Sequence, residues 1–271
     1  MTDIRQSQLW MNYWQKKGYK TLKINSEKKG VLYGTLHPLL LGFNLLKIQR
    51  GCNDPDWDDL RIKKRKNKVL STIIEPWTNV NQDRYKEHGY KLSNFPYLAT
   101  KTIIVNLGKS KEILWRGLSE NTKRLIKKNA GLEIRNVKPS VFLKYWKKNS
   151  KIWVLGLGDL ETMRSVLGKK VLFLLGYIDG VAQSGLLIVE TEDTANYLHS
   201  FTTTSGRQSG AHFKLVWECM LKEKSKGILF FDFEGIYDSR WPQKRWLGFS
   251  EFKKKFGGKE VSFPGCFHKW F

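Results

Sequence analysis

The sequence predicts an α+β fold with a mixed sheet in each half of the chain. Three patterns favour it: short runs rich in β-branched and aromatic residues, helical spacing of apolar residues between these runs, and turn formers at the junctions. The chain has 271 residues, of which 41% are hydrophobic and 13% aromatic. That is enough to bury the core of one large domain or of two small ones.

The first half of the chain alternates between short strands and helices. An apolar stretch at residues 31–48 is broken by Gly34, Pro38 and Gly42, so it predicts two strands and a turn. A membrane-spanning helix would need roughly 20 mostly apolar residues. The turn formers in "QRGCNDPDWDD" predict a loop over residues 49–59. The other elements expected in this half are strands at 31–36, 41–49, 69–76 and 102–105 and helices at 8–17 and 79–88.

The segment "SKEILWRGLSENTKRLIKKNAG" predicts one continuous helix in the middle of the chain. Ser110 can cap its beginning, and Gly131 can end it as the first residue past the helix. Leu114, Leu118 and Leu125 recur at helical spacing and form the expected buried stripe. Lysine and arginine side chains on the opposite side form a basic ridge.

The second half of the chain predicts a second mixed sheet. "VLFLLGYIDGVAQSGLLIVE" places an Asp179-Gly180 turn between two apolar strands, which is typical of a β-hairpin. A glycine-rich loop over residues 205–210 opens a helix that stops at Gly227, and the buried strand "ILFFDF" follows. The remaining elements expected here are strands at 132–137 and 195–202 and helices at 139–149 and 160–167.

The charge of the chain indicates a polyanionic partner. Lysine and arginine total 48 against 25 aspartates and glutamates, which gives a net charge of +23. The excess is spread through a folded, aromatic-rich chain rather than collected in a tail. Nucleic acid, anionic lipid headgroups and a phosphate-rich substrate all fit this charge.

The cysteines and histidines indicate neither a disulfide framework nor a metal site. Cys52, Cys219 and Cys266 lie far apart in the sequence, and the five histidines have no metal-ligand spacing. Incidental thiols of this kind are typical of a protein in a reducing cytoplasm.

A hairpin, a strand, a glycine-rich loop, a helix and a strand, in this order, resemble the acyltransferase fold called GNAT. In that fold, backbone N–H groups of the loop and the helix N-terminus bind the phosphates of an acyl carrier. The matching loop in this chain is "GRQSGA". The resemblance implies phosphate contacts for Arg207 and Gly210.

Four segments extend the resemblance to the FemABX aminoacyltransferases, which build the interpeptide bridges of peptidoglycan. They are "QSQLW", "LWRGLSENTKRLIKKNAGLEIR", "SGRQSGAHFKLVWECMLKEKSKGILFFDFEGI" and "GFSEFKKKFGG", and together they span nearly the whole chain. The resemblance implies two GNAT-like subdomains with mixed sheets, one at residues 1–108, completed by about 255–271, and one at 109–254. Because the chain has no long charged heptad stretch, we expect no coiled-coil arm.

The resemblance also implies a reaction and its partners. The donor would be an aminoacyl-tRNA, and the acceptor would be the stem-peptide amine of lipid II or of UDP-MurNAc-pentapeptide. An aminoacyl ester is already activated, so we expect no metal and no cofactor. We expect a cytoplasmic monomer with a peripheral contact to the anionic inner face of the membrane.

The motif F-K-x-x-F-G, at residues 252–257, carries the most specific part of the resemblance. It implies that Lys253 and its neighbour Phe252 lie at the reacting centre; the alternative for Lys253 is a solvated lysine on an amphipathic helix. Asp232 ends the buried strand "ILFFDF". Its carboxylate either orients the acceptor amine and accepts its proton, or caps the turn at Gly235.

Further residues are expected to bind the acceptor. The resemblance implies that Arg164 and one of Lys16 or Lys17 clamp the acceptor phosphates. Trp241 and Trp246 lie in a charged loop, where stacking on a substrate competes with a place in the core. We expect both tryptophans at the acceptor site.

Donor phosphates would meet the basic ridge of the central helix. Lys123, Arg124 and Lys127 form this ridge, and Arg207 and Gly210 of the glycine-rich loop would add to it. The alternative for the ridge is a solvated face without a ligand, since many lysine runs in soluble proteins have only that role.

Two other classes of function fit part of the sequence. A GNAT-like N-acyltransferase that uses acyl-CoA or an acyl carrier protein would need the same phosphate contacts. A non-catalytic protein that binds RNA or a membrane surface would need only the charge, and it would bind RNA in a salt-sensitive way.

Overall fold

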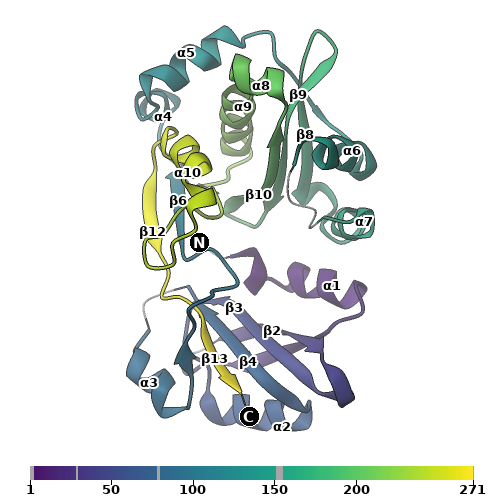
Figure 1. Cartoon of the computed structure of the whole chain (residues 1–271), viewed down its shortest axis with the longest axis vertical. Helices are drawn as coiled ribbons and strands as arrows, with labels where there is room; N and C mark the ends of the chain where they lie inside the picture. Colours follow the sequence, from purple (N-terminus) through teal and green to yellow (C-terminus); the bar gives the residue numbers. More distant parts are fainter. Residues whose placement is uncertain (1–2, 29, 78–79, 151–154, 271) are drawn as a thin grey trace. The chain divides into compact units, whose positions relative to one another are not determined.

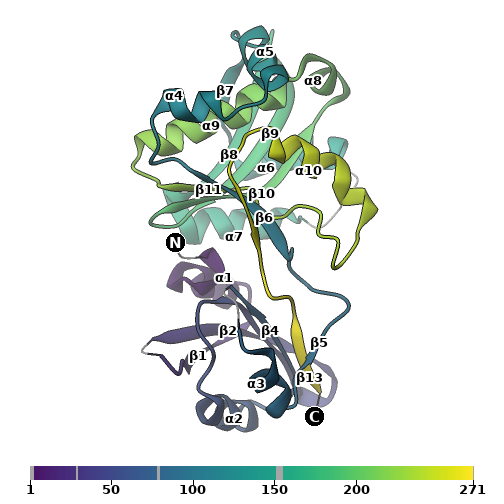
Figure 2. The same cartoon turned by 90° about the vertical axis from the view of Figure 1, so that its left-hand side faces the viewer.

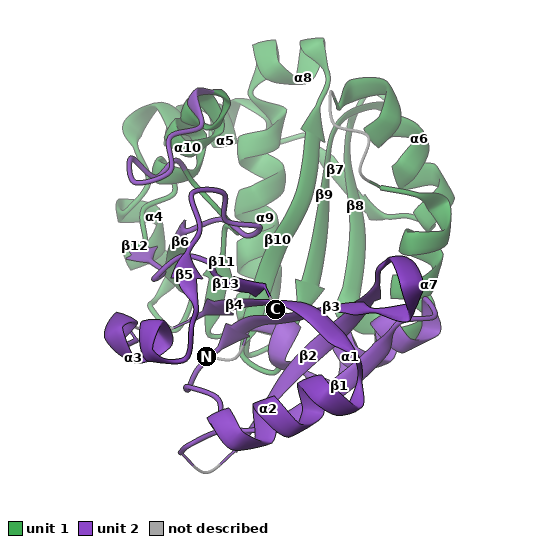
Figure 3. Cartoon of the chain, turned by 60° about the horizontal axis from the view of Figure 1, so that its bottom comes forward, with its two compact units in different colours: residues 1–2, 102–236, 245–260 green, residues 3–101, 237–244, 261–271 purple. Residues whose placement is uncertain are grey.

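The chain forms two compact units in the computed structural model, which describes residues 3–28, 30–77, 80–150 and 155–270. Unit 1 consists of Thr102–Ile236 and Arg245–Glu260, and unit 2 consists of Asp3–Lys101, Tyr237–Lys244 and Val261–Phe271 (Figure 3). Each unit is built on a mixed sheet, so the predicted α+β class is confirmed.

Unit 2 contains a six-stranded sheet with the order β1-β2-β3-β4-β13-β5 (Figure 1). Strands β3 and β4 are parallel, and the other neighbours are antiparallel. The strands are β1 (Lys20–Asn25), β2 (Val31–Pro38), β3 (Asn44–Gly51), β4 (Val69–Pro76), β5 (Lys91–Leu92) and β13 (Phe267–Trp270).

The last strand of the chain lies inside this sheet rather than at its edge. Phe267 of β13 pairs with Ile74 on one side and with Leu92 on the other. Its ring is buried and packs 4.4 Å from the ring of Tyr85, measured between centroids. The sheet of unit 2 therefore cannot close until residues from the end of the chain have joined it.

Helices cover both faces of the unit 2 sheet. The core under α2 and α3 contains Leu46, Ile48 and Leu60, and α1 lies on the opposite face (Figure 1). The carboxylate of Asp56 accepts the N–H groups of Asp58 and Asp59 in the first turn and starts α2. The loop expected over residues 49–59 therefore ends at Asp56, which corrects the sequence-based boundary. The helices are η1 (Ile4–Gln6), α1 (Gln8–Lys16), η2 (Leu40–Gly42), α2 (Trp57–Lys66) and α3 (Gln82–Glu87).

Two elements of the first half, α3 and β1, differ from the sequence prediction. Asn79, where the sequence places the start of a helix, lies outside the described residues, and α3 begins at Gln82 after its cap Asn81. The sequence also missed β1, since its alternation of lysines with apolar residues is short.

Unit 1 is built on a seven-stranded sheet with the order β12-β6-β11-β10-β9-β8-β7 (Figure 2). Val105 of β6 pairs with Phe231 of β11, so the strand expected at 102–105 belongs to this sheet and not to the first one. Strands β10 and β11 are parallel. The strands are β6 (Lys101–Asn106), β7 (Glu133–Asn136), β8 (Val171–Ile178), β9 (Val181–Glu190), β10 (Thr194–Thr202), β11 (Phe230–Asp232) and β12 (Lys259–Ser262).

Helices also cover both faces of the unit 1 sheet. Helix α9 packs on one face with α5 against it, and α6 and α7 pack on the other (Figure 1). The described helices include no coiled-coil arm, and none has the length and apolarity to cross a membrane. They are α4 (Lys111–Arg116), α5 (Glu120–Lys128), α6 (Pro139–Asn149), α7 (Leu157–Leu167), η3 (Gly168–Lys170), α8 (Thr204–Ser209), α9 (Ala211–Ser225), η4 (Lys244–Trp246) and α10 (Leu247–Lys254).

The central helix predicted from residues 110–131 is in fact two helices. Ser110 caps α4 as expected, but the Ser119 hydroxyl accepts the N–H of Thr122 and starts α5. A second cap of this kind offers the backbone an alternative to helix continuation. Asn129, not Gly131, caps the end of α5.

The predicted hairpin is confirmed, whereas the glycine-rich loop is not a loop. Asp179 and Gly180 have φ angles of +49° and +74°, as a tight hairpin turn between β8 and β9 requires. Residues 204–209 form the short helix α8, and Gly210, with φ +77°, turns the chain into α9. The motif thus joins two helices.

The close approach of α8 to β9 predicts a stability difference between two glycines. A Cβ on Gly206 would lie 2.1 Å from the backbone oxygen of Gln183, so Gly206→Ala should lower the free energy of unfolding by about 1–3 kcal/mol. Gly158 in α7 has open space around it, so Gly158→Ala should raise it by about 0.5–1 kcal/mol. Urea denaturation checks both, and equal effects would contradict the packing described here.

Candidate active site

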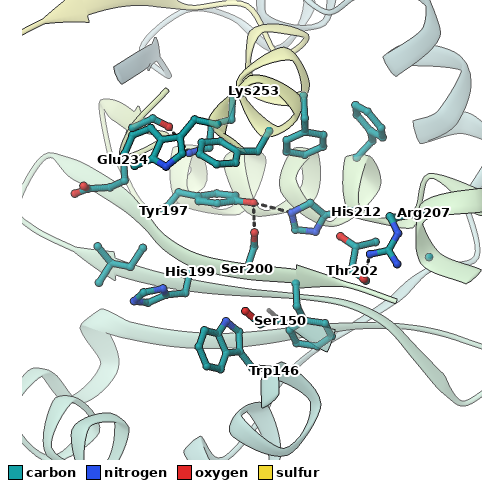
Figure 4. A pocket seen from close by; sticks show the side chains of 18 of the residues that line it. Trp146, Ser150, Tyr197, His199, Ser200, Thr202, Arg207, His212, Glu234 and Lys253 are labelled. Carbon is teal, nitrogen blue, oxygen red and sulfur yellow. Dashed lines mark hydrogen bonds between the residues drawn. The ribbon is translucent and has the colours of Figure 1, made fainter. Parts of the chain in front are cut away.

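A cavity of about 580 Å³ opens in unit 1 where β10 and β11 separate. The parallel pairing of these strands ends at Asn196 and Asp232. Beyond that point, residues 197–202 line one side of the cavity and Glu234 and Gly235 line the other (Figure 4). Helices α6, α8, α9 and α10 supply the remaining walls.

Lys253 of α10 reaches the end of strand β11. Its Nζ donates hydrogen bonds of 2.6 Å to the carbonyl oxygens of Phe233 and of Gly235. The Nζ atom also lies 5.3 Å from the ring centroid of Tyr197 and 5.0 Å from that of Phe249. The ammonium group has three donors, so one remains beside the cavity.

The environment of Lys253 changes its protonation. The residue is only 7% exposed, and burial lowers its pKa to about 8, against the opposing effect of Asp232 and Glu234. A buried cation with a perturbed pKa in a cavity wall is typical of functional sites.

Asp232 lies behind the cavity wall and has the contacts of a structural cap. Its Oδ1 accepts the hydroxyl of Thr102 at 2.5 Å and the N–H of Glu234 at 2.7 Å. It is 3% exposed and is not among the described lining residues. These contacts match one of the two roles that the sequence leaves open for Asp232.

Glu234 is the carboxylate that lines the cavity, and its backbone is held in an unusual conformation. Its φ is +56°, which is rare for a residue with a side chain. Asp232 binds its N–H, Lys253 binds the carbonyls on both sides of it, and the Thr102 hydroxyl accepts the next N–H, that of Gly235, at 3.2 Å. Such over-determined strain clusters at functional sites.

A hydrogen-bonded chain of three side chains, which includes Tyr197 beside Lys253, also lines the cavity (Figure 4). The Tyr197 hydroxyl donates to Ser200 Oγ at 2.6 Å and lies 2.8 Å from His212 Nε2. Burial lowers the pKa of His212 to about 3 and raises the pKa of Tyr197, so both are neutral at pH 7. Phe252 stacks on the His212 ring with 5.2 Å between centroids.

The turn between α8 and α9 forms another part of the wall. Arg207 donates to the Thr202 carbonyl oxygen at 2.8 Å and to the Thr204 hydroxyl at 3.3 Å, and its guanidinium is exposed. Gly210 precedes α9, whose 15 residues give its N-terminus a favourable field for anions.

The structure gathers only part of the predicted site residues around this cavity. Those that line it are Phe252, Lys253, Trp246, Arg207 and Gly210. The other predicted residues of unit 1 do not line it, namely Asp232, Arg164, Lys123, Arg124 and Lys127. The rest lie in unit 2, namely Lys16, Lys17 and Trp241.

The predicted residues outside the cavity have partners of their own in unit 1. Lys123 Nζ lies 2.6 Å from a carboxylate oxygen of Glu120, and Arg124 donates to Asn121 at 2.9 Å. Arg164 donates to the Gly168 carbonyl oxygen at 3.1 Å. A role for them in binding stays a prediction.

Two of the predicted residues of unit 2, Lys17 and Trp241, also have partners. Lys17 Nζ lies 5.2 Å from the ring of Trp14. Trp241 donates from Nε1 to the Ser93 carbonyl oxygen at 3.0 Å, as a packed tryptophan usually does.

The sequence did not single out Tyr197, Ser200, His212 or Glu234. Tyr197 and Ser200 belong to a strand that reads as core, and His212 lies just inside a helix start, where a histidine is usually structural. Glu234 lies two residues after Asp232, so only the left-handed φ separates their roles. In the described part of the chain, no three His, Cys, Asp or Glu side chains cluster as a metal site would require.

The comparisons with known proteins agree with the fold of the chain. Residues 176–270 match the model of the FemAB family, a range that includes β9 to β13 and Lys253. No curated protein matches the sequence. The crystal structure of FemX is similar with a TM-score of 0.81 and 13% identity over 99% of this chain and 92% of that chain.

Two further solved structures have the same fold. One is the C-terminal domain (DUF2156) of a putative lysylphosphatidylglycerol synthetase from Agrobacterium fabrum, with a TM-score of 0.62 and 13% identity over 98% of this chain and 88% of that chain. The other is a tandem GNAT protein from the clavulanic acid biosynthesis pathway, with a TM-score of 0.57 and 10% identity over 92% of this chain and 83% of that chain. The predicted GNAT-like fold and the FemABX resemblance are confirmed.

The burial of Lys253 predicts a pH-dependent contribution to stability. Below pH 8 the amine is charged in the folded and unfolded chains, and the cost of burying it is fully present. Between about pH 8 and 10.5 the unfolded chain binds more protons, so the stability of the wild type should rise relative to Lys253→Met, by on the order of 3 kcal/mol.

Urea denaturation of both proteins at pH 7 and pH 10.5 measures this difference. Lys254→Met removes the neighbouring, half-exposed lysine and controls for the loss of one amine from α10. A constant difference between wild type and Lys253→Met would contradict the lowered pKa of Lys253.

Proposed function

From the FemABX resemblance of this chain, we propose that it is an aminoacyltransferase. It would move an amino acid from aminoacyl-tRNA to the stem-peptide amine of a peptidoglycan precursor, lipid II or UDP-MurNAc-pentapeptide. The observation that carries the proposal is the buried Lys253 ammonium, which lies in the F-K-x-x-F-G motif and borders the cavity where β10 and β11 separate.

The proposed reaction needs no further activation of the donor. The acceptor nitrogen attacks the ester carbonyl carbon, a C–N bond forms, and the C–O bond to the ribose breaks. The proton lost by the amine ends on the ribose hydroxyl. The protein has to align the two substrates and stabilise the negative oxygen of the tetrahedral intermediate.

Lys253 is suited to stabilise that oxygen. Two of its donors are bound to the carbonyls of Phe233 and Gly235, so the position of the ammonium is fixed before a substrate arrives. The pKa of about 8 leaves it mostly charged at neutral pH. A preorganised cation in a water-poor cavity contributes much more than one in solution.

The two ends of the cavity have opposite charge, which orients the donor. In the view of Figure 4, Arg207 and Glu234 lie at opposite ends, with Lys253 in the wall between them. Arg207 and the start of α9 suit the phosphates near the 3′ end of a tRNA. Glu234 suits an ammonium group, which an aminoacyl donor has and an acyl-CoA lacks.

Ser200 and Tyr197 can carry the proton between the substrates. Ser200 Oγ borders the cavity and is bonded to the Tyr197 hydroxyl, which in turn contacts neutral His212. A hydroxyl can accept a proton from the attacking amine while it releases its own to the leaving oxygen.

Lys253→Met tests the role of the ammonium. Loss of one such donor should slow the transfer by on the order of 10²–10³-fold. The measurement is single-turnover transfer from a mixed aminoacyl-tRNA pool to lipid II or UDP-MurNAc-pentapeptide, with the product identified by mass spectrometry.

Lys254→Met is the matched control, because this side chain is half exposed and faces Glu251 and Glu260. It should transfer at the wild-type rate. Transfer from acetyl-CoA but from no tRNA would replace the proposal with the N-acyltransferase alternative, and salt-sensitive RNA binding without any transfer would replace it with the non-catalytic one.

Glu234 variants separate a functional from a structural role. Glu234→Gln keeps the shape but removes the charge, and it should reduce the preference for aminoacyl over α-hydroxyacyl-tRNA by about 10–100-fold, since one charge-assisted contact is lost. Glu234→Gly relieves the positive φ, so it should raise the free energy of unfolding by up to about 1 kcal/mol while transfer falls.

Glu251→Gln, on the exposed side of α10, controls for the loss of a negative charge. An unchanged donor preference in Glu234→Gln would remove this carboxylate from the mechanism and leave the proposed reaction in place.

A further inference from the structure

The connection between β2 and β3 in unit 2 exposes an unusual set of apolar side chains. Residues 39–43 read Leu-Leu-Leu-Gly-Phe. Leu40 and Leu41 are 87% and 92% exposed, and Leu39 and Phe43 are each 37% exposed. Single exposed apolar residues are common, but a contiguous exposed group marks a site of interaction.

The backbone holds this apolar connection in a fixed shape. Leu39 donates its N–H to the Phe43 carbonyl oxygen at 2.8 Å, and Phe43 donates to the Leu40 carbonyl oxygen at 3.3 Å. Leu41 has φ +58°, a left-handed conformation that a leucine rarely adopts. A polar or glycine residue would suit this turn better, so the exposed leucine points to a function.

Cations surround the apolar connection on both sides. Lys20 begins β1, which pairs with β2 close to its end. Lys68 precedes β4, and its carbonyl oxygen accepts the N–H of Asn44, the first residue of β3, at 2.9 Å. Arg65 and Lys66 lie in the last turn of α2, just before Lys68. These four exposed residues, Lys20, Arg65, Lys66 and Lys68, are called the basic collar below.

Acidic groups of unit 2 gather at the other end of the same strands. Asp59 accepts the N–H of Asn25, the last residue of β1, at 2.6 Å. Glu27 lies in the β1–β2 connection and donates its N–H to the Asp54 carbonyl oxygen. Asp56 caps the start of α2, which then runs toward the basic collar. Asp59 and Glu27 form ion pairs there with Lys63 and Arg84, so their charge is compensated at that end.

We propose that residues 39–43 and the basic collar form a docking surface for an anionic phospholipid bilayer. The leucines would enter the boundary between headgroups and acyl chains, and the collar would lie among the anionic headgroups. The net charge of +23 attracts the whole protein to an anionic membrane at longer range. A second copy of this chain is disfavoured as the occupant, because it would bring the two collars together.

Vesicle co-sedimentation tests the proposal without any transfer activity, so its outcome is independent of the proposed function. The wild type should bind vesicles that contain phosphatidylglycerol and should bind phosphatidylcholine vesicles weakly. The double variant Leu40→Ser, Leu41→Ser should bind at least about ten-fold more weakly. Each neutralised collar residue (Arg65→Gln, Lys66→Gln, Lys68→Gln) should weaken binding about five-fold and reduce its salt dependence.

Matched variants in unit 1 show whether vesicle binding depends on residues 39–43 and the basic collar or on exposed apolar and basic side chains in general. Val181→Ser and Leu229→Ser alter side chains that are 60% and 48% exposed, and Lys147→Gln with Lys148→Gln alters two exposed lysines of α6. All of these should bind vesicles like the wild type. Because Leu40 and Leu41 are exposed, their variants should also keep the wild-type melting temperature.

Three results would overturn the proposal. The first is a wild type that binds neither kind of vesicle, and the second is equal binding by the leucine variants and their controls. The third is a wild-type dimer in sedimentation equilibrium that the leucine variants dissociate, which would make a second copy the occupant.

Discussion

The contact between one buried ammonium group and the end of one strand organises the site. Lys253 Nζ binds the carbonyl oxygens of Phe233 and Gly235, and this contact fixes both the helix that carries the lysine and the turn that follows β11. Because the group is buried, its pKa falls to about 8, and the carbonyls compensate part of the lost hydration. The stability of the turn and the proposed chemistry therefore depend on the same atoms.

The turn that Lys253 holds belongs to a larger feature, the separation of two parallel strands. Once β10 and β11 part after Asn196 and Asp232, their backbones no longer bond to each other. Asp232, Thr102 and Lys253 supply the missing partners on the β11 side. The space between the strands becomes the cavity, and Glu234 is presented to it.

The sequence predicts the helices and strands that have a strong local pattern. It does not predict those whose existence or bounds depend on tertiary contacts. Helix α6 and the Asp179-Gly180 hairpin follow from local pattern. The break before α5 depends on a serine cap inside an otherwise helical pattern. The resemblance implies that the end of the chain completes the first half, but not that it forms β13, because this strand depends on pairing with β4 nearly 200 residues earlier. Lys253 was found through its motif. Glu234 was not, since composition and spacing cannot show which of two carboxylates two residues apart faces a cavity.

The most direct measurement is an NMR titration of the Lys253 side chain in protein labelled with ¹⁵N-lysine, its signal assigned from the spectrum of Lys253→Met. The account predicts a midpoint near pH 8 and a shift of this signal when an aminoacyl ester analogue binds. A midpoint near the ordinary lysine value of about 10.4, with no response to the analogue, would contradict it.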